Sequence, residues 1–167
     1  MKYIYYGLIG ILLIGCAQNA TVEIGFNDGA LLAGTFGDMI ISVSKIELLQ
    51  NEEYIPIWEK SSVVRVPVNG ENFCSITNSY ISIAPGNYRY LRITVDSLGY
   101  IIDNSITPLI DSVCQFTASS FSEIIVEEND EYKFVIGITS ANWFDSESLK
   151  IKTGHQPFEG ANLKVFY

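Results

Sequence analysis

The feature that most constrains this chain is an alternation of polar and apolar residues with a period of two. Residues 21–26, 90–95 and 132–138 each carry apolar side chains at every second position. Such alternation is typical of strands with one buried face, and the abundant Val, Ile, Tyr, Phe and Thr favour strands as well. No segment has the pattern of a three-turn amphipathic helix. The sequence therefore predicts an all-β protein.

Turn residues separate these segments at the spacing of a β-sandwich. Asn27-Asp28-Gly29 and Asn69-Gly70 end two of them, and Pro85-Gly86 fits a type II turn. The acidic residues 127–130 are expected to form a hairpin turn. We expect an antiparallel β-sandwich, Ig-like or transthyretin-like, in one domain over residues 21–167, with less regular loops at 141–160. The predicted strands are 21–26, 39–49, 54–58, 62–68, 74–83, 87–97, 112–117, 121–127, 131–139 and 161–167.

The strand predicted at 39–49 contains a change of phase. Its apolar residues occupy positions 39, 41 and 43 and then positions 46 and 48. A β-bulge near Ser44-Lys45 would bring both sets to the core.

The N-terminus has the layout of an export signal. Lys2 precedes an apolar run that ends in Leu13-Ile14-Gly15-Cys16. The run is shorter than the roughly 20 apolar residues of a membrane span. Its end resembles the bacterial lipobox, which implies cleavage after Gly15 and a diacylglyceryl thioether on Cys16. A plain secretory signal is the alternative. We expect a signal peptide at 1–15, the lipidated Cys16 with a tether at 16–20, and the folded domain beyond.

This signal predicts where the protein works. Several acyl chains on Cys16 would hold the domain stably on a membrane of the cell envelope. Ala17 is not the Asp that favours inner-membrane retention, which favours the outer membrane if the source is Gram-negative. The chain carries a formal net charge of −9, and removal of Lys2 makes it more negative. Because such a surface repels phosphates, nucleic acid is not an expected partner.

The two cysteines outside the signal form an even pair. Cys74 and Cys114 would lie in an oxidising compartment, which predicts a disulfide between them. Two buried free thiols are the alternative.

The sequence contains no convincing catalytic set. The single histidine, His155, lies in a Gly/Pro loop, and no Gly-x-Ser-x-Gly motif is present. One histidine and two cysteines make no zinc site, and no spacing singles out a pair of carboxylates. The clusters at 127–131 and around Asp28 and Asp38 are interpreted as solvated turns, with calcium binding as the alternative. We expect no enzyme activity, no cofactor and no bound metal.

Aromatic residues give the remaining candidates for a binding site. Trp143 and Phe144 follow Asn142 just after a strong strand. They are interpreted as a plug for the open end of the sandwich, and contact with a sugar is the alternative. Tyr88, Tyr90 and Arg92 are expected in an outward row, as cross-strand packing or as a binding face.

Two longer runs resemble a known family. Residues 40–48, Ile-Ile-Ser-Val-Ser-Lys-Ile-Glu-Leu, lead to a second strand at 54–58, and residues 83–93 contain Pro-Gly-Asn-Tyr-Arg-Tyr-Leu-Arg. Together they resemble the DUF4382-type lipoprotein domains over residues 21–140. The resemblance implies a β-sandwich and an envelope address but no chemistry.

Two functions fit these features. The first is a non-catalytic binding or adhesion module that contacts a glycan, a polymer or a protein. The second is a structural subunit of an envelope assembly, in which strand edges pair with neighbours.

Overall fold

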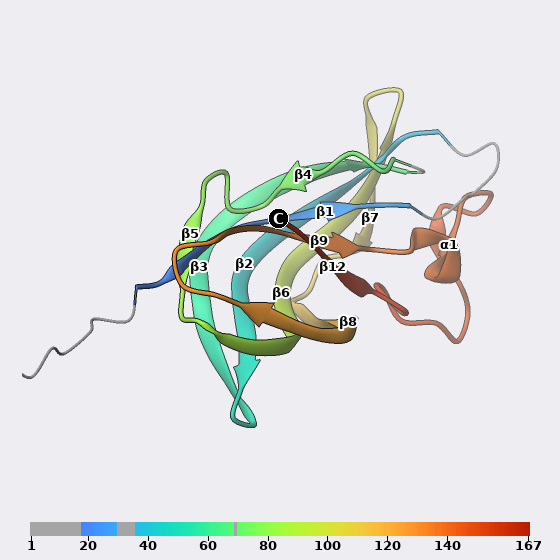
Figure 1. Ribbon diagram of the computed structural model, residues 1–167. Coiled ribbons are helices and arrows are strands. Elements are labelled where there is room, and N and C mark those ends of the chain that lie inside the picture. The colour runs from blue at the N-terminus through green and yellow to red at the C-terminus, as the bar shows by residue number, and fades with distance from the viewer. Residues whose placement is uncertain (1–17, 30–35, 69) are drawn as a thin grey trace, which may run out of the picture.

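The computed structural model describes residues 18–29, 36–68 and 70–167, and these residues form a nearly all-β domain (Figure 1). Strands make up 65% of them, beside one short helix, α1 (Ser140–Trp143). The predicted all-β class is confirmed. The predicted signal peptide and Cys16 lie outside the described residues. Within the described ranges, no helix is long and apolar enough to cross a membrane.

The strands differ from the predicted segments mainly in length. The segments predicted at 54–58 and 62–68 are parts of one strand, and so are those at 112–117 and 121–127. The segment predicted at 74–83 is two short strands with a turn between them. The strands are β1 (Ala20–Asn27), β2 (Asp38–Gln50), β3 (Glu53–Pro67), β4 (Cys74–Ser75), β5 (Ile81–Ile83), β6 (Gly86–Ile102), β7 (Ser105–Ile110), β8 (Cys114–Val126), β9 (Glu131–Gly137), β10 (Phe144–Asp145), β11 (Lys150–Ile151) and β12 (Asn162–Phe166).

Ten of these strands form one large sheet. Its order is β3-β2-β6-β8-β12-β9-β1-β4, while β5 pairs with β1 and β7 pairs with β6. The sheet curls until it is nearly closed, and β3 at one end touches β4 and β5 at the other (Figure 1). A cluster of buried apolar side chains from both halves of the sheet fills the interior.

Two strand pairs are parallel, unlike the antiparallel arrangement expected from the sequence. β1 pairs with β9 in parallel, and β12 pairs with β8 in parallel. The turn at 127–130 joins strands that are not neighbours, because β12 lies between β8 and β9. The predicted hairpin is therefore wrong. Pairing with β9 buries Leu163 of β12 in the core at 3% exposure, and a local turn signal gives no hint of that long-range gain.

The predicted bulge in β2 is confirmed. The register of β2 shifts between Val43 and Lys45 against both β3 and β6. Before and after the shift the apolar side chains point inward, and Ile41 and Ile46 are both fully buried. The bulge also turns Lys45 and its second neighbour Glu47 to the outer face of the sheet, where they contact side chains of β3 and β6.

Aromatic side chains close the end of the sheet beyond β9. Trp143 and Phe144 are fully buried, and the indole Nε1 of Trp143 donates to the carbonyl oxygen of Ile138 at 2.9 Å. The carboxylate of Asp28, also fully buried, accepts hydrogen bonds from the backbone N–H and the hydroxyl of Ser140. Because the first N–H groups of a helix have no partner within it, Asp28 satisfies one at the start of α1.

Cys74 and Cys114 are free thiols, so the predicted disulfide is wrong. They lie on β4 and β8, which are not neighbours in the sheet, so no strand pairing holds the two thiols together. Both side chains pack against the core instead. Burial raises the pKa of both thiols, and the charge of Asp38 adds to the effect on Cys74.

Candidate functional site

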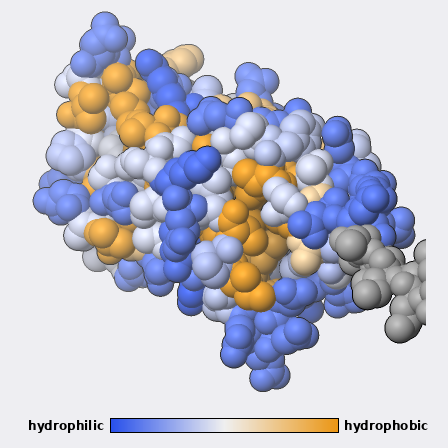
Figure 2. Space-filling model, turned by 90° about the vertical axis from the view of Figure 1, so that its left-hand side faces the viewer, coloured by the Kyte–Doolittle hydropathy of each residue, from blue (hydrophilic) through white to orange (hydrophobic). Residues whose placement is uncertain are grey.

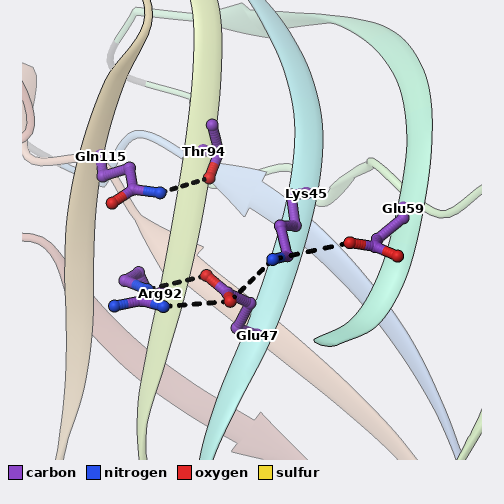
Figure 3. A network of polar contacts seen from close by, with 6 residues as sticks. All are labelled: Lys45, Glu47, Glu59, Arg92, Thr94 and Gln115. Carbon is purple, nitrogen blue, oxygen red and sulfur yellow. Dashed lines mark hydrogen bonds and ion pairs between the residues drawn. The ribbon is translucent and has the colours of Figure 1, made fainter. Parts of the chain in front are cut away.

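A strip of charged and polar side chains crosses the outer face of β3, β2 and β6 (Figure 3). Glu47 of β2 is 3% exposed, and its carboxylate accepts two hydrogen bonds from the Arg92 guanidinium of β6, at 2.7 and 3.0 Å. Lys45 Nζ lies 3.0 Å from Glu47 Oε1 and 3.5 Å from Glu59 Oε1 of β3. The strip thus links three neighbouring strands through their side chains.

The charges in this strip hold one another in the ionised state. Hydrogen bonds from Arg92 lower the pKa of Glu47, against the opposing effect of burial. Glu47 in turn raises the pKa of Arg92 and of Lys45. Lys45 and Arg92 balance the carboxylates of Glu47 and Glu59, so the strip is close to neutral in a chain of net charge −9.

Aromatic rings lie beside the strip. The Arg92 guanidinium stacks 3.9 Å from the ring centroid of Tyr54, a cation–π contact. Tyr90 is half-buried on the same outer face as Arg92. Tyr88 is 3% exposed and its hydroxyl donates to the carbonyl oxygen of Ala84 at 2.8 Å. The outward row was therefore predicted wrongly at Tyr88, because a register shift against β8 separates it from Tyr90.

On β8 the strip continues into a cavity of about 460 Å³. Gln115 Nε2 donates to Thr94 Oγ1 of β6 at 3.0 Å (Figure 3). Thr117 lies opposite Arg92 in the register of β8 and β6. Gln115 and Thr117 also line the cavity, whose other wall is the loop 154–160 with Gln156 and Glu159. Amides, a hydroxyl and a carboxylate thus converge on one hollow.

The loop wall of this cavity is held in place from below. The Phe158 ring is 3% exposed and stacks on Phe116 of β8 with centroids 4.2 Å apart, and Trp143 lies 5.4 Å away. Thr139 Oγ1 and Asn142 Nδ2 each donate to the carbonyl oxygen of Glu159 at 3.2 Å. The cavity is therefore formed before any ligand arrives.

The residues predicted as ligand contacts support this wall without facing a ligand. Trp143 and Phe144 have no exposed surface, which agrees with the plug interpretation and leaves their rings no open face for a sugar in this structure. Asn142 is exposed, but its amide is bonded to the loop. His155 is a surface residue whose Nδ1 lies 2.8 Å from Glu159 Oε2.

Sequence reasoning missed the cavity itself. The one local signal was the pair Gly154 and Gly160, which bound the loop and adopt positive φ angles of 83° and 80°. The partner wall comes from β8, about 40 residues earlier in the chain, and nothing in either segment announces the other.

Asp28 and Asp38, which the sequence offered as calcium ligands, make structural contacts. In the part of the chain that the structure describes, no group of three or more His, Cys, Asp or Glu side chains is arranged to hold a metal ion. Asp28 caps α1, while Asp38 pairs with Arg65 of β3. Neither of the clusters considered for calcium forms a cage within these residues.

The opposite end of the sheet has a different surface. A smaller cavity of about 190 Å³ lies there between β3, β5 and the start of β6, lined largely by apolar side chains such as Ile55, Ile57 and Ile83. Figure 2 views the molecule from this side and shows apolar areas set in a mainly hydrophilic surface. Convergent polar groups distinguish the cavity at β8 from this one.

Comparisons with protein-family models, with curated proteins and with solved structures find no match for this chain.

Proposed function

We propose that this protein is a lipid-anchored lipoprotein of the cell envelope and that its β domain is a non-catalytic binding or adhesion module. The contact surface is the polar strip together with the cavity between β8 and the loop 154–160. The observation that carries the proposal is the preformed cavity of about 460 Å³, lined by amide and hydroxyl groups.

The position of the cavity fits a domain anchored at Cys16. Asn19 is three residues from Cys16, a reach of about 11 Å, and its amide donates to Ser82 Oγ at 2.8 Å at the start of β1. At the far end of β1, Asn27 pairs with Gly137, which pairs with Asn162, which in turn pairs with Ser119. Ser119 follows the cavity-lining residues of β8, so the cavity lies near that end of β1. The eight residues of β1 span about 25 Å. An anchored domain would thus present this cavity away from the membrane.

The chemistry of the surface favours a neutral polar ligand. Its charges are paired with each other, and the uncharged groups beside them are the amides of Gln115 and Gln156, the hydroxyl of Thr117 and the ring of Tyr90. Such groups bind the hydroxyls and apolar faces of a glycan or a similar envelope polymer. The paired carboxylate of Glu47 has no spare capacity for acid–base work, which supports a module without enzyme activity.

The finer fold prediction belongs to the same proposal. It is a sandwich of Ig-like or transthyretin-like type that resembles the DUF4382-type lipoproteins, and the one buried cluster shared by both halves of the curled sheet supports two packed layers. The outer membrane remains the proposed address if the source is Gram-negative.

Two experiments test the proposal. Fractionation of cells that express the full chain should find it in the membrane, and Cys16→Ser should release it or leave it uncleaved. Envelope glycans and polymers should be retained by the immobilised wild-type protein and lost with Thr117→Arg, which fills the cavity. Val63→Arg, on the exposed face of β3, is the matched control. Equal retention by wild type and Thr117→Arg would refute the proposed surface.

A structural subunit is the second candidate function, and exposed apolar side chains favour it. Phe121 in β8 is 100% exposed, Ile125 is 57% exposed and Phe166 is 54% exposed. A contiguous patch of such side chains marks a protein contact, so this candidate requires that they act as one surface. Crosslinking in the native envelope should then capture neighbouring proteins. These crosslinks should be lost with Phe121→Lys and kept with Val63→Lys.

A further inference from the structure

One edge of β8 has no strand beside it along the cavity. β8 pairs with β6 from Cys114 to Ser119 on one side. On the other side β12 meets it only at the pair Asn162 and Ser119. Among the described residues, the backbone of 114–118 has no strand partner on the cavity side. Because backbone N–H and C=O groups are strong hydrogen-bonding groups, this edge is a template for another strand.

The composition of this edge leaves it open to pairing. Residues 114–118 read Cys-Gln-Phe-Thr-Ala and contain neither a charge nor a proline. The free edge of β3 at the end of the sheet carries Pro56, Lys60, Arg65 and Pro67, and such residues block strand addition. The edge of β3 is therefore protected by its composition, whereas the edge of β8 at 114–118 carries no such residues and faces the cavity.

The opposite wall fixes what fits beside this edge. The loop 154–160 faces β8 across the cavity and is anchored by the buried Phe158. Five strand residues cover about 16 Å, and an added strand lies about 4.8 Å from its neighbour. Glu159 is the charged residue among the cavity-lining side chains; its Oε2 lies 2.8 Å from His155 Nδ1, which leaves Oε1 for a ligand. A ligand with one basic side chain would match it.

We propose that the cavity binds an extended peptide segment, which adds as a strand to the edge of β8 at 114–118, with a Lys or Arg side chain directed to Glu159. This inference rests on the proposed binding function and assigns the cavity a polypeptide in place of the glycan considered above. Backbone hydrogen bonds to β8 supply affinity, and Gln115, Thr117 and Glu159 supply selectivity.

The test uses a random heptapeptide library displayed on phage. The immobilised protein begins at Gln18, since the buried core cluster lies wholly within 20–165. Peptides are selected on wild type and counter-selected on Thr117→Arg, and Val63→Arg is the control that should still bind them. A selected peptide is then resynthesised with one backbone nitrogen methylated at a time.

Strand addition has a signature in that scan. Methylation should weaken binding about tenfold or more at every second residue and little at the residues between, because only alternate N–H groups face β8. The bound peptide should also shield Cys114, which lines the cavity, from maleimide and leave Cys74 as reactive as before. Replacement of the basic residue by Gln should weaken binding to wild type but not to Glu159→Gln.

The outcomes separate this inference from the wider proposal. Failure to select any peptide that depends on the cavity overturns the inference, as does a methylation scan without alternation. Retention of a glycan by wild type and its loss with Thr117→Arg would still uphold the binding module in either case.

Discussion

The edges of β3 and β8 show two ways in which one sheet treats its free strands. β3 carries prolines and charges along its length, and Arg65 is paired with Asp38 on the neighbouring strand. β8 has one charged residue, Glu123, and meets a folded loop across a cavity. Prolines and charges disfavour strand pairing at β3, which also touches β4 and β5, whereas a folded loop faces the edge of β8. Binding of a ligand at the edge of β8 should therefore depend on the buried Phe158 beneath the loop 154–160, and contacts at the edge of β3 should not.

The largest expected effect comes from truncating the aromatic anchor beneath each edge. Phe158→Ala and Trp58→Ala both remove a buried ring, and each should lower the free energy of unfolding by about 3–5 kcal/mol in urea titrations. Phe158 supports the cavity wall, so only Phe158→Ala should also abolish ligand binding under conditions where both variants stay folded. Equal loss of binding in both would mean that the loop has no special role.

A smaller effect is expected from the ion pair between the two edges. Glu47→Gln leaves Arg92 and Lys45 without their carboxylate and should cost about 1.5–3 kcal/mol at neutral pH. The pKa of Glu47 is lowered from 4.5 in the folded state. Its contribution is therefore complete above about pH 4.5 and is lost as the pH falls through the lower folded value.

Urea unfolding of wild type and Glu47→Gln over a pH series checks this sign. The difference between them should shrink steadily below about pH 4.5. A difference that stays constant into strong acid would show that the pairing adds nothing to stability. Because the strip lies between β3 and β8, Glu47→Gln should lower the stability of the whole sheet and not that of one edge.

The rate at which each thiol is alkylated measures how accessible it is beside β3 or β8. Cys74 lies in β4, which touches β3, and Cys114 lies in β8 beside the cavity. Because burial raises the pKa of both above 9.0, alkylation by maleimide should be slow at neutral pH and still accelerate above pH 9.0. Mass spectrometry of the unreduced protein that begins at Gln18, and so lacks Cys16, should find two free thiols. A mass lower by two hydrogens would show the disulfide instead.

The smallest stability change is expected from a charge placed at either edge. Gln115→Lys on β8 and Val63→Lys on β3 alter exposed side chains and should each change the unfolding free energy by less than about 0.5 kcal/mol. Binding should distinguish them, since Gln115 lines the cavity and Val63 does not. Weaker binding in both variants would remove the distinction between the edges.

Much of the fold could be predicted from the sequence because strand geometry is local. Alternation predicted most of the strands, and the phase change in β2 predicted the bulge at Ser44-Lys45. The plug at Trp143 followed from two large aromatic residues after a strand. The failures at the hairpin, at Tyr88 and at the disulfide all concern which strands are neighbours, or how a register shifts.

The candidate site was harder to predict for the same reason. Glu47 and Arg92 are 45 residues apart and meet only because β2 and β6 pair. The cavity needs β8, the loop 154–160 and the buried Phe158 at once, and none of them signals the others in the sequence.

The sequence by itself determined the β class, the inward faces of most strands and the bulge, because backbone pleating repeats every two residues. The predicted export signal and Cys16 also come from sequence alone. Only the tertiary structure decided that β12 enters between β8 and β9 and leaves the edge at 114–118 free. That choice depends on burial summed over segments distant in the chain, which no local pattern records.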